Sequence, residues 1–163
     1  MRVQAAIDIA APPALVWDFV TDPARYLHFM NGVTRWEVAS ERPRGCGARY
    51  RTLMRVGSAE VGGLVEIVEH DEPRDLAWTS VTGVDQRGRW RLRERADGAR
   101  THVELRLQYG VAGAGPLGWV AEQVAAPAVR ENLRRSLREL KRQAEHEQAR
   151  AAVAARRAAA AQR

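Results

Sequence analysis

The apolar and polar residues of this chain recur with two different periods, and the changes of period separate predicted helices from predicted strands. Val3–Ile9 alternates as a short strand. Two prolines follow, and the apolar residues from there to Val20 recur at helical spacing, with proline tolerated in the first helical turn. Thr21-Asp22-Pro23 places a capping side chain before another proline and predicts a second helix over Ala24–Phe29.

From Val33 onward the period changes to two. Apolar residues alternate with arginine and glutamate, and Asp97-Gly98 is a strong hairpin turn. The predicted strands cover Val33–Ser40, Ala48–Val56, Val61–Glu69, Leu76–Thr82, Gln86–Arg95 and Thr101–Tyr109. Six successive strands that are half apolar and half charged indicate an antiparallel sheet with one solvated face and one covered face.

A long amphipathic helix is predicted from Pro116 onward and supplies the cover for the sheet. Its apolar stripe comprises Leu117, Val120, Ala121, Val124, Ala128, Val129, Leu133, Leu137 and Leu140. Pro127 lies inside this helix and is expected to bend it. The stripe ends near Ala144, so we divide the chain into a domain over 1–145 and an Ala/Arg-rich tail over 146–163. For the tail, the sequence leaves a helical extension, fraying and disorder open.

The element order is therefore β-α-α-β-β-β-β-β-β-α, an α+β arrangement. We expect a curved seven-stranded antiparallel sheet wrapped around one long C-terminal helix, with two short helices closing one end.

This order, together with the segments that carry it, resembles the START/Bet v1-like (SRPBCC) superfamily, and within it the polyketide cyclase/dehydrase and lipid-transport family. The resembling segments are 9–17, 21–26, 69–78, 88–92 and 97–103, and the resemblance spans about residues 3–143. It implies a helix-grip fold, whose interior is rarely filled by side chains. It also implies binding of lipids, quinones, sterols, hormones or polyketides, with catalysis in only some members.

Candidate ligand-binding residues follow from the phases of the predicted strands and helices. They combine large apolar side chains with a few hydroxyls, which is typical of small-molecule cavities. They are Tyr26, Leu27, Met30, Tyr50, Thr52, Met54, Trp78, Ser80, Trp90, Leu92, Val120, Gln123 and Val124. An ordinary filled core built from the same residues is the alternative. The phase of Trp78 is ambiguous, because Ala77, Thr79 and Val81 form a nearly equivalent inner face.

No metal or cofactor is expected. The four histidines lack partners at ligand spacing, and Cys46 is the single cysteine, which excludes an intramolecular disulfide. Residues 113–118 read G-x-G-x-x-G, but no strand follows to complete a dinucleotide-binding unit, and Pro116 removes an amide that a phosphate would need.

The net charge of +6 is concentrated at the C-terminal end. Six of the 26 basic residues but only two of the 20 acidic residues follow position 140. We therefore do not expect nucleic-acid binding, and we treat contact with an anionic membrane surface as an open alternative. Because the chain has neither an apolar leader nor a membrane-spanning apolar run, we expect a cytoplasmic protein.

Three functional hypotheses result. The first is binding or carriage of a hydrophobic small molecule in an internal cavity. The second is a polyketide cyclase or dehydratase acting on a poly-β-keto intermediate, with Tyr50 as the candidate acid/base group and Tyr109 as a further one. The third is an interaction module that binds anionic surfaces through the basic tail. The sequence specifies neither the ligand nor the oligomeric state.

Overall fold

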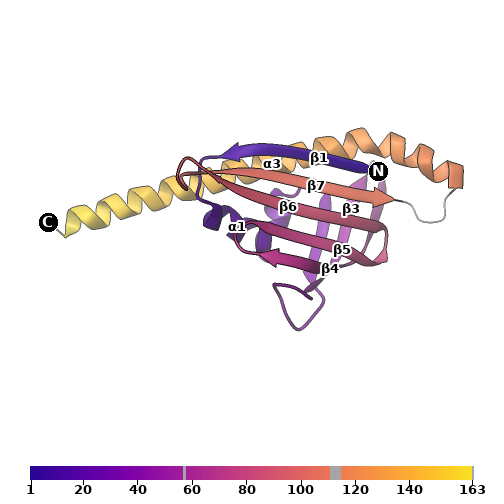
Figure 1. Ribbon diagram of the computed structural model, residues 1–163, viewed down its shortest axis with the longest axis horizontal. Helices are drawn as coiled ribbons and strands as arrows, with labels where there is room; N and C mark the ends of the chain where they lie inside the picture. The colour runs from indigo at the N-terminus through magenta and orange to yellow at the C-terminus, as the bar shows by residue number, and fades with distance from the viewer. Residues whose placement is uncertain (57, 111–114, 163) are drawn as a thin grey trace.

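The computed structural model describes residues 1–56, 58–110 and 115–162. The side chains of residues 56, 59 and 115–125 fall outside the description. The predicted element order and fold are confirmed, with a curled seven-stranded antiparallel sheet and one long C-terminal helix (Figure 1). The elements are β1 Arg2–Ile9, α1 Pro13–Thr21, α2 Pro23–Phe29, β2 Val33–Val38, β3 Arg49–Val56, β4 Ala59–Asp71, β5 Asp75–Gly83, β6 Asp85–Arg95, β7 Arg100–Gly110 and α3 Gly115–Ala161.

The strand order in the sheet is β1-β7-β6-β5-β4-β3-β2, so the first two strands of the chain form the two edges. Every neighbouring pair is antiparallel. The register shifts between Val33 and Arg35 on β2, and twice along β4. Such irregularities bend strands and increase their twist, which favours a curled sheet.

Local sequence accounts for the two short helices that connect β1 to β2. Pro13 occupies the first turn of α1, and Pro23 the first turn of α2. The Asp22 carboxylate caps α2 by accepting a hydrogen bond from the Ala24 amide at 2.9 Å, which satisfies one of the free donors at the start of a helix. Val16, Phe19 and other apolar residues of α1 are buried and anchor the pair to the core.

Helix α3 packs on the concave face of the sheet through a stripe of buried residues at helical spacing. The stripe consists of Ala126, Val129, Leu133, Leu137, Leu140 and Ala144. Pro127 lies within the helix, which continues past it without interruption. Beyond Gln148 every described residue is exposed, and this end of α3 projects away from the sheet (Figure 1).

Among the described helices, none has the combination of length and apolar character that crossing a membrane requires. Within the same residues, no cluster of three or more His, Cys, Asp or Glu side chains could hold a metal ion. Part of the G-x-G-x-x-G segment, residues 113 and 114, lies outside the described residues.

Candidate functional site: an apolar cavity between the sheet and α3

Three small hollows lie among the described residues on the concave side of the sheet, two of them lined partly by α3 and the third by α1, α2 and the strands. We call the first the main hollow; its volume is about 30 Å³. The second, the adjoining hollow, has about 50 Å³ and shares Met54, Gln86, Leu107 and Val129 with the first. The third, the side hollow, has about 10 Å³. The interior is thus nearly filled, because sites for drug-sized ligands usually measure several hundred Å³.

The main hollow has an apolar lining with a few neutral polar groups. Its residues come from α2, from the strands and from α3. They are Tyr26, Met30, Asn31, Val33, Trp36, Thr52, Leu53, Met54, Trp78, Gln86, Leu105, Leu107, Val129, Asn132 and Leu133. None of these residues is charged, and neither is any described residue that lines the adjoining hollow.

Three stacked aromatic rings form one wall. Trp36 lies between Tyr26 and Tyr50, with ring centroids 4.1 Å and 5.2 Å away and planes within 21° of parallel. Trp78 meets Trp36 edge-on at 6.2 Å. Offset stacking and edge contacts are the favourable geometries for aromatic pairs, so this wall is well ordered by its own contacts.

The hydroxyl groups of Tyr26 and Tyr50 differ in their hydrogen bonds. The Tyr26 oxygen accepts a bond from Trp90 Nε1 at 3.3 Å, and burial raises the pKa of Tyr26 well above its usual value. The Tyr50 hydroxyl donates to the Pro43 carbonyl at 2.6 Å, and burial also raises its pKa. Both groups are therefore neutral phenols at physiological pH, and the hydroxyl hydrogen of Tyr50 is already engaged.

Trp78 projects into the interior, because its ring lies over Gly88 of the neighbouring strand. A Cβ atom at Gly88 would stand only 1.9 Å from Trp78 Cζ2. The indole is 4 % exposed, and its Nε1 has no hydrogen-bond partner among the described residues. A buried donor without an acceptor costs free energy, and it is therefore a candidate contact for a bound molecule.

Six of the residues predicted from the sequence lie around these hollows. Tyr26, Met30, Thr52, Met54 and Trp78 line the main hollow, and Tyr50 lines the side hollow.

The remaining predicted residues lie elsewhere. Leu27 is 44 % exposed, and Trp90 and Leu92 are buried in the core and belong to the described lining of none of these three hollows. The Ser80 hydroxyl interacts with Asp85 and accepts from the Gln86 amide. Val120, Gln123 and Val124 belong to α3, but their side chains lie outside the described ones.

Sequence reasoning missed several contributors to these linings, among them Trp36 and His70. Trp36 sits on an edge strand with a register shift, which obscures its phase. The histidines were considered from the sequence only as metal ligands, yet His70 lines the side hollow and packs against the Trp17 ring at 5.1 Å. The alternation of β4 could have indicated the position of His70 only if its two register shifts were known.

Comparisons with known proteins agree with this architecture. The family model described as "Polyketide cyclase / dehydrase and lipid transport" matches residues 1–145. No functionally curated protein matches the chain.

Three solved structures illustrate the similarity in fold. A Thermus thermophilus protein has a TM-score of 0.75 at 23% identity, covering 88% of this chain and 97% of its own. A Streptomyces aromatase/cyclase, Zhui, has a TM-score of 0.74 at 22% identity, and the match covers 89% of this chain and 93% of that one. A START superfamily protein from Mycobacterium smegmatis has a TM-score of 0.67 at 14% identity, and the match covers 87% of this chain and 97% of that one. At these identities the similarity concerns the fold alone.

Proposed function

Because the chain belongs to the polyketide cyclase/dehydrase and lipid transport family, we propose that it binds an uncharged hydrophobic small molecule between the sheet and α3. One observation carries this proposal. The described residues that line the main and adjoining hollows include aromatic and aliphatic side chains, hydroxyls and amides, but no charged group.

The absence of a countercharge in the described lining selects against ionised ligands. Moving a carboxylate from water into such a site costs several kcal/mol unless a cation pairs with it. An apolar ligand of the same shape has no such cost, and burial of its surface contributes about 25 cal/mol per Å². Free fatty acids and acidic metabolites are therefore disfavoured relative to neutral ketones, alcohols and amides.

Neutral polar groups at the lining would orient the ligand. The side-chain amides of Asn31, Gln86 and Asn132 make no hydrogen bond to another described residue. Trp78 Nε1 lacks an acceptor in the described part of the chain. A ligand carbonyl or hydroxyl oxygen would satisfy such donors while its apolar body contacts the aromatic wall.

The small volume of the hollows means that ligand entry must displace side chains. Met30 and Met54 line the main hollow, and Met54 also lines the adjoining one. Methionine has three rotatable side-chain bonds and repacks readily, so these residues are the ones we expect to move.

The test is isothermal titration calorimetry with two ligands of nearly equal shape, the neutral ketone 2-acetonaphthone and the carboxylate 2-naphthoate. We expect one ketone per chain, bound at least about 100-fold more tightly than the carboxylate. Met54→Ala enlarges both hollows and should increase the affinity several-fold, whereas Val129→Phe should reduce it at least about tenfold.

Val153→Phe, on the exposed part of α3, is the matched control and should leave binding unchanged. Circular dichroism and thermal melts establish that each variant folds. Equal affinity for the ketone and the carboxylate, or no effect of Val129→Phe, would refute the proposed site.

A second candidate function, cyclisation or dehydration of a poly-β-keto substrate, is favoured by one observation. His70 and Tyr50 both line the side hollow next to the aromatic wall, and histidine is the usual general acid/base at neutral pH. Turnover that is lost in His70→Asn and retained in Tyr50→Phe would assign the proton transfer to the imidazole. A product distribution that is identical with and without protein would exclude catalysis.

A further inference from the structure

The outer face of the sheet, opposite α3, carries a separate and larger hollow, which we call the arginine hollow. It has a volume of about 840 Å³ and is lined by five arginines, Arg2, Arg87, Arg89, Arg91 and Arg106. They come from the neighbouring strands β1, β6 and β7. No acidic side chain belongs to its described lining, which also includes the neutral polar residues Gln4, Thr79 and Gln108.

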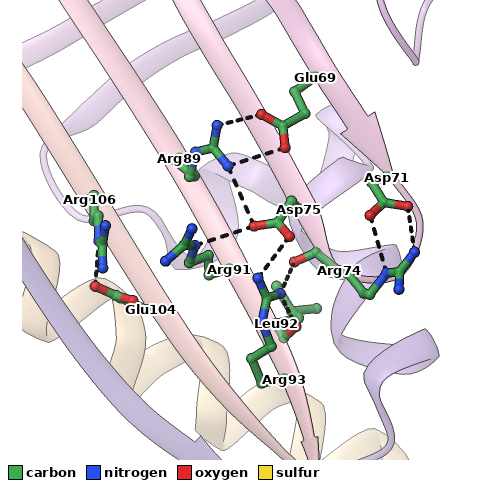
Figure 2. A network of polar contacts seen from close by, with 10 residues as sticks. All are labelled: Glu69, Asp71, Arg74, Asp75, Arg89, Arg91, Leu92, Arg93, Glu104 and Arg106. Atoms are coloured by element: carbon green, nitrogen blue, oxygen red, sulfur yellow. Dashed lines mark hydrogen bonds and ion pairs between the residues drawn. The ribbon is translucent and has the colours of Figure 1, made fainter.

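Two of these arginines face each other directly. Arg89 on β6 is the cross-strand partner of Arg106 on β7. Like charges directly opposite on neighbouring strands are unfavourable. Each guanidinium is drawn to a carboxylate instead, Arg89 to Glu69 with one contact of 3.1 Å, and Arg106 to Glu104 at 2.5 Å. Figure 2 shows these two ion pairs directed away from each other.

The carboxylates around the hollow do not balance its arginines. Asp75 is 8 % exposed and lies 3.7 Å from Arg89, 3.5 Å from Arg91 and 2.9 Å from Arg93 (Figure 2). It is thus shared among three cations. Its contact with Arg91 is too long for a good hydrogen bond, and Arg91 Nε is buried without an acceptor among the described residues.

The other two arginines have no carboxylate partner in the described part of the chain. Arg2 and Arg87 lie in one row across the sheet, each paired in register with Gln108 between them. This row is two residues along the strands from the row of Arg89 and Arg106. Two residues of an extended strand span about 7 Å, which separates the backbones of the two rows, and the long arginine side chains allow their guanidinium groups to converge on one ligand.

From this arrangement we propose that the arginine hollow binds a soluble ligand carrying two linked phosphoryl groups, that is, a diphosphate. The planar guanidinium group binds phosphate oxygens in a bidentate manner and cannot lose its charge at physiological pH. One phosphoryl group would lie between Arg89 and Arg106, and the other beside Arg2 and Arg87. The arginines lie on the opposite face of the sheet from the apolar cavity, and the two linings have only Trp78 and Leu107 in common.

Titration of the full chain with inorganic pyrophosphate, followed by calorimetry and by phosphorus-31 NMR, tests this proposal. Pyrophosphate should bind one per chain, at least about tenfold more tightly than orthophosphate or sulfate. The double variant Arg2→Gln/Arg87→Gln should weaken pyrophosphate binding at least about tenfold. These two arginines have no ion pair among the described residues, so their replacement should not disturb folding.

Arg51→Gln is the matched control, because Arg51 is an exposed arginine on β3 and does not line the hollow. It should leave the affinity unchanged. If Arg51→Gln and the double variant lost pyrophosphate affinity equally, the effect would come from the overall charge of the protein and the proposal would be overturned. Binding to a polyglutamate peptide or to phosphatidylglycerol vesicles without binding to pyrophosphate would also overturn it, since the partner would then be an acidic protein or a membrane surface.

Discussion

At the scale of single residues, the shape of the interior depends on the pairing of Gly88 with Trp78. The two residues are directly opposite on β6 and β5, and the indole occupies the space where a side chain at position 88 would lie. The same indole makes an edge contact with Trp36, which stacks between Tyr26 and Tyr50. A substitution at Gly88 that displaces Trp78 should therefore disturb the packing of the whole aromatic wall.

Gly88→Ala is expected to destabilise the fold by about 1–3 kcal/mol, because the new methyl group overlaps the Trp78 ring. The cost should fall when Trp78→Phe is already present, since the smaller ring vacates part of that space. Urea denaturation of the wild type, the two single variants and the double variant measures the coupling. An equal cost of Gly88→Ala in both backgrounds would mean that the ring contact is not its cause.

The sequence allowed us to predict several residues on the inner face of the sheet, but not how their side chains pack. The strict alternation of β3 indicated that Tyr50, Thr52 and Met54 share a face, and all three line an internal hollow. The phase of Trp78 was ambiguous in the sequence, because Ala77, Thr79 and Val81 form a nearly equivalent inner face, and in the structure every residue from Asp75 to Trp78 is buried. The side of the sheet on which Trp78 lies is determined by its packing against Gly88 on the next strand. The residue pattern within β5 alone cannot predict that contact.

At the scale of elements, α3 is fixed to the end of β1 and to the segment after α2 by polar contacts as well as by its buried stripe. The Ser136 hydroxyl accepts from the Asn31 amide, and Lys141 donates to the Asp8 carbonyl at 2.8 Å. The Glu145 carboxylate accepts from the Ala10 amide at 2.8 Å and from Lys141 at 2.6 Å. The bonds of Lys141 and Glu145 join the helix to the end of β1, at the boundary of the family match.

The Glu145 contacts predict a pH-dependent contribution to stability. Burial raises the pKa of Glu145, but hydrogen bonds from Lys141 and the Ala10 amide outweigh it and lower the pKa below 4.5. A lowered pKa in the folded state stabilises the protein above the unfolded pKa, and this stabilisation is lost as the pH falls through the folded one. Glu145→Gln should therefore cost about 0.5–1 kcal/mol at pH 7, allowing for solvent screening.

Chemical denaturation at pH 7 and at pH 3 measures this difference between the wild type and Glu145→Gln. We expect the difference in free energy of unfolding between the two proteins to be smaller at pH 3 than at pH 7. Glu41→Gln, at an exposed position without a described ion pair, serves as the control and should show no gap at either pH. A Glu145→Gln gap that is the same at both pH values would show that charge at this site does not matter.

Every predicted element appears in the structure, with boundaries that differ by at most a few residues, because prolines, glycines and the change of period mark the ends locally. The end of α3 was the exception. Alanine and arginine favour helix formation but provide no apolar stripe, so the sequence left the state of the tail open. In the structure the helix continues to Ala161 without packing on the sheet.

At the scale of the whole molecule, charge and apolar surface are separated by the sheet. The described cavity lining on the concave face is uncharged, and five arginines line the hollow on the outer face. The family match ends at residue 145, and we propose residues 1–145 as the ligand-binding unit. The hypothesis that the basic tail over 146–163 binds anionic surfaces stays a prediction, which deletion of these residues would test.

The most direct test of the account is native mass spectrometry of the protein purified from its own host, followed by organic extraction of the bound material. We predict a 1:1 complex with a neutral, apolar compound that is released on denaturation, and less of this complex in Val129→Phe than in Val153→Phe. A protein that carries no adduct, and that also fails to bind 2-acetonaphthone in either the wild-type or the Met54→Ala form, would contradict the central claim. The interior would then be a filled core.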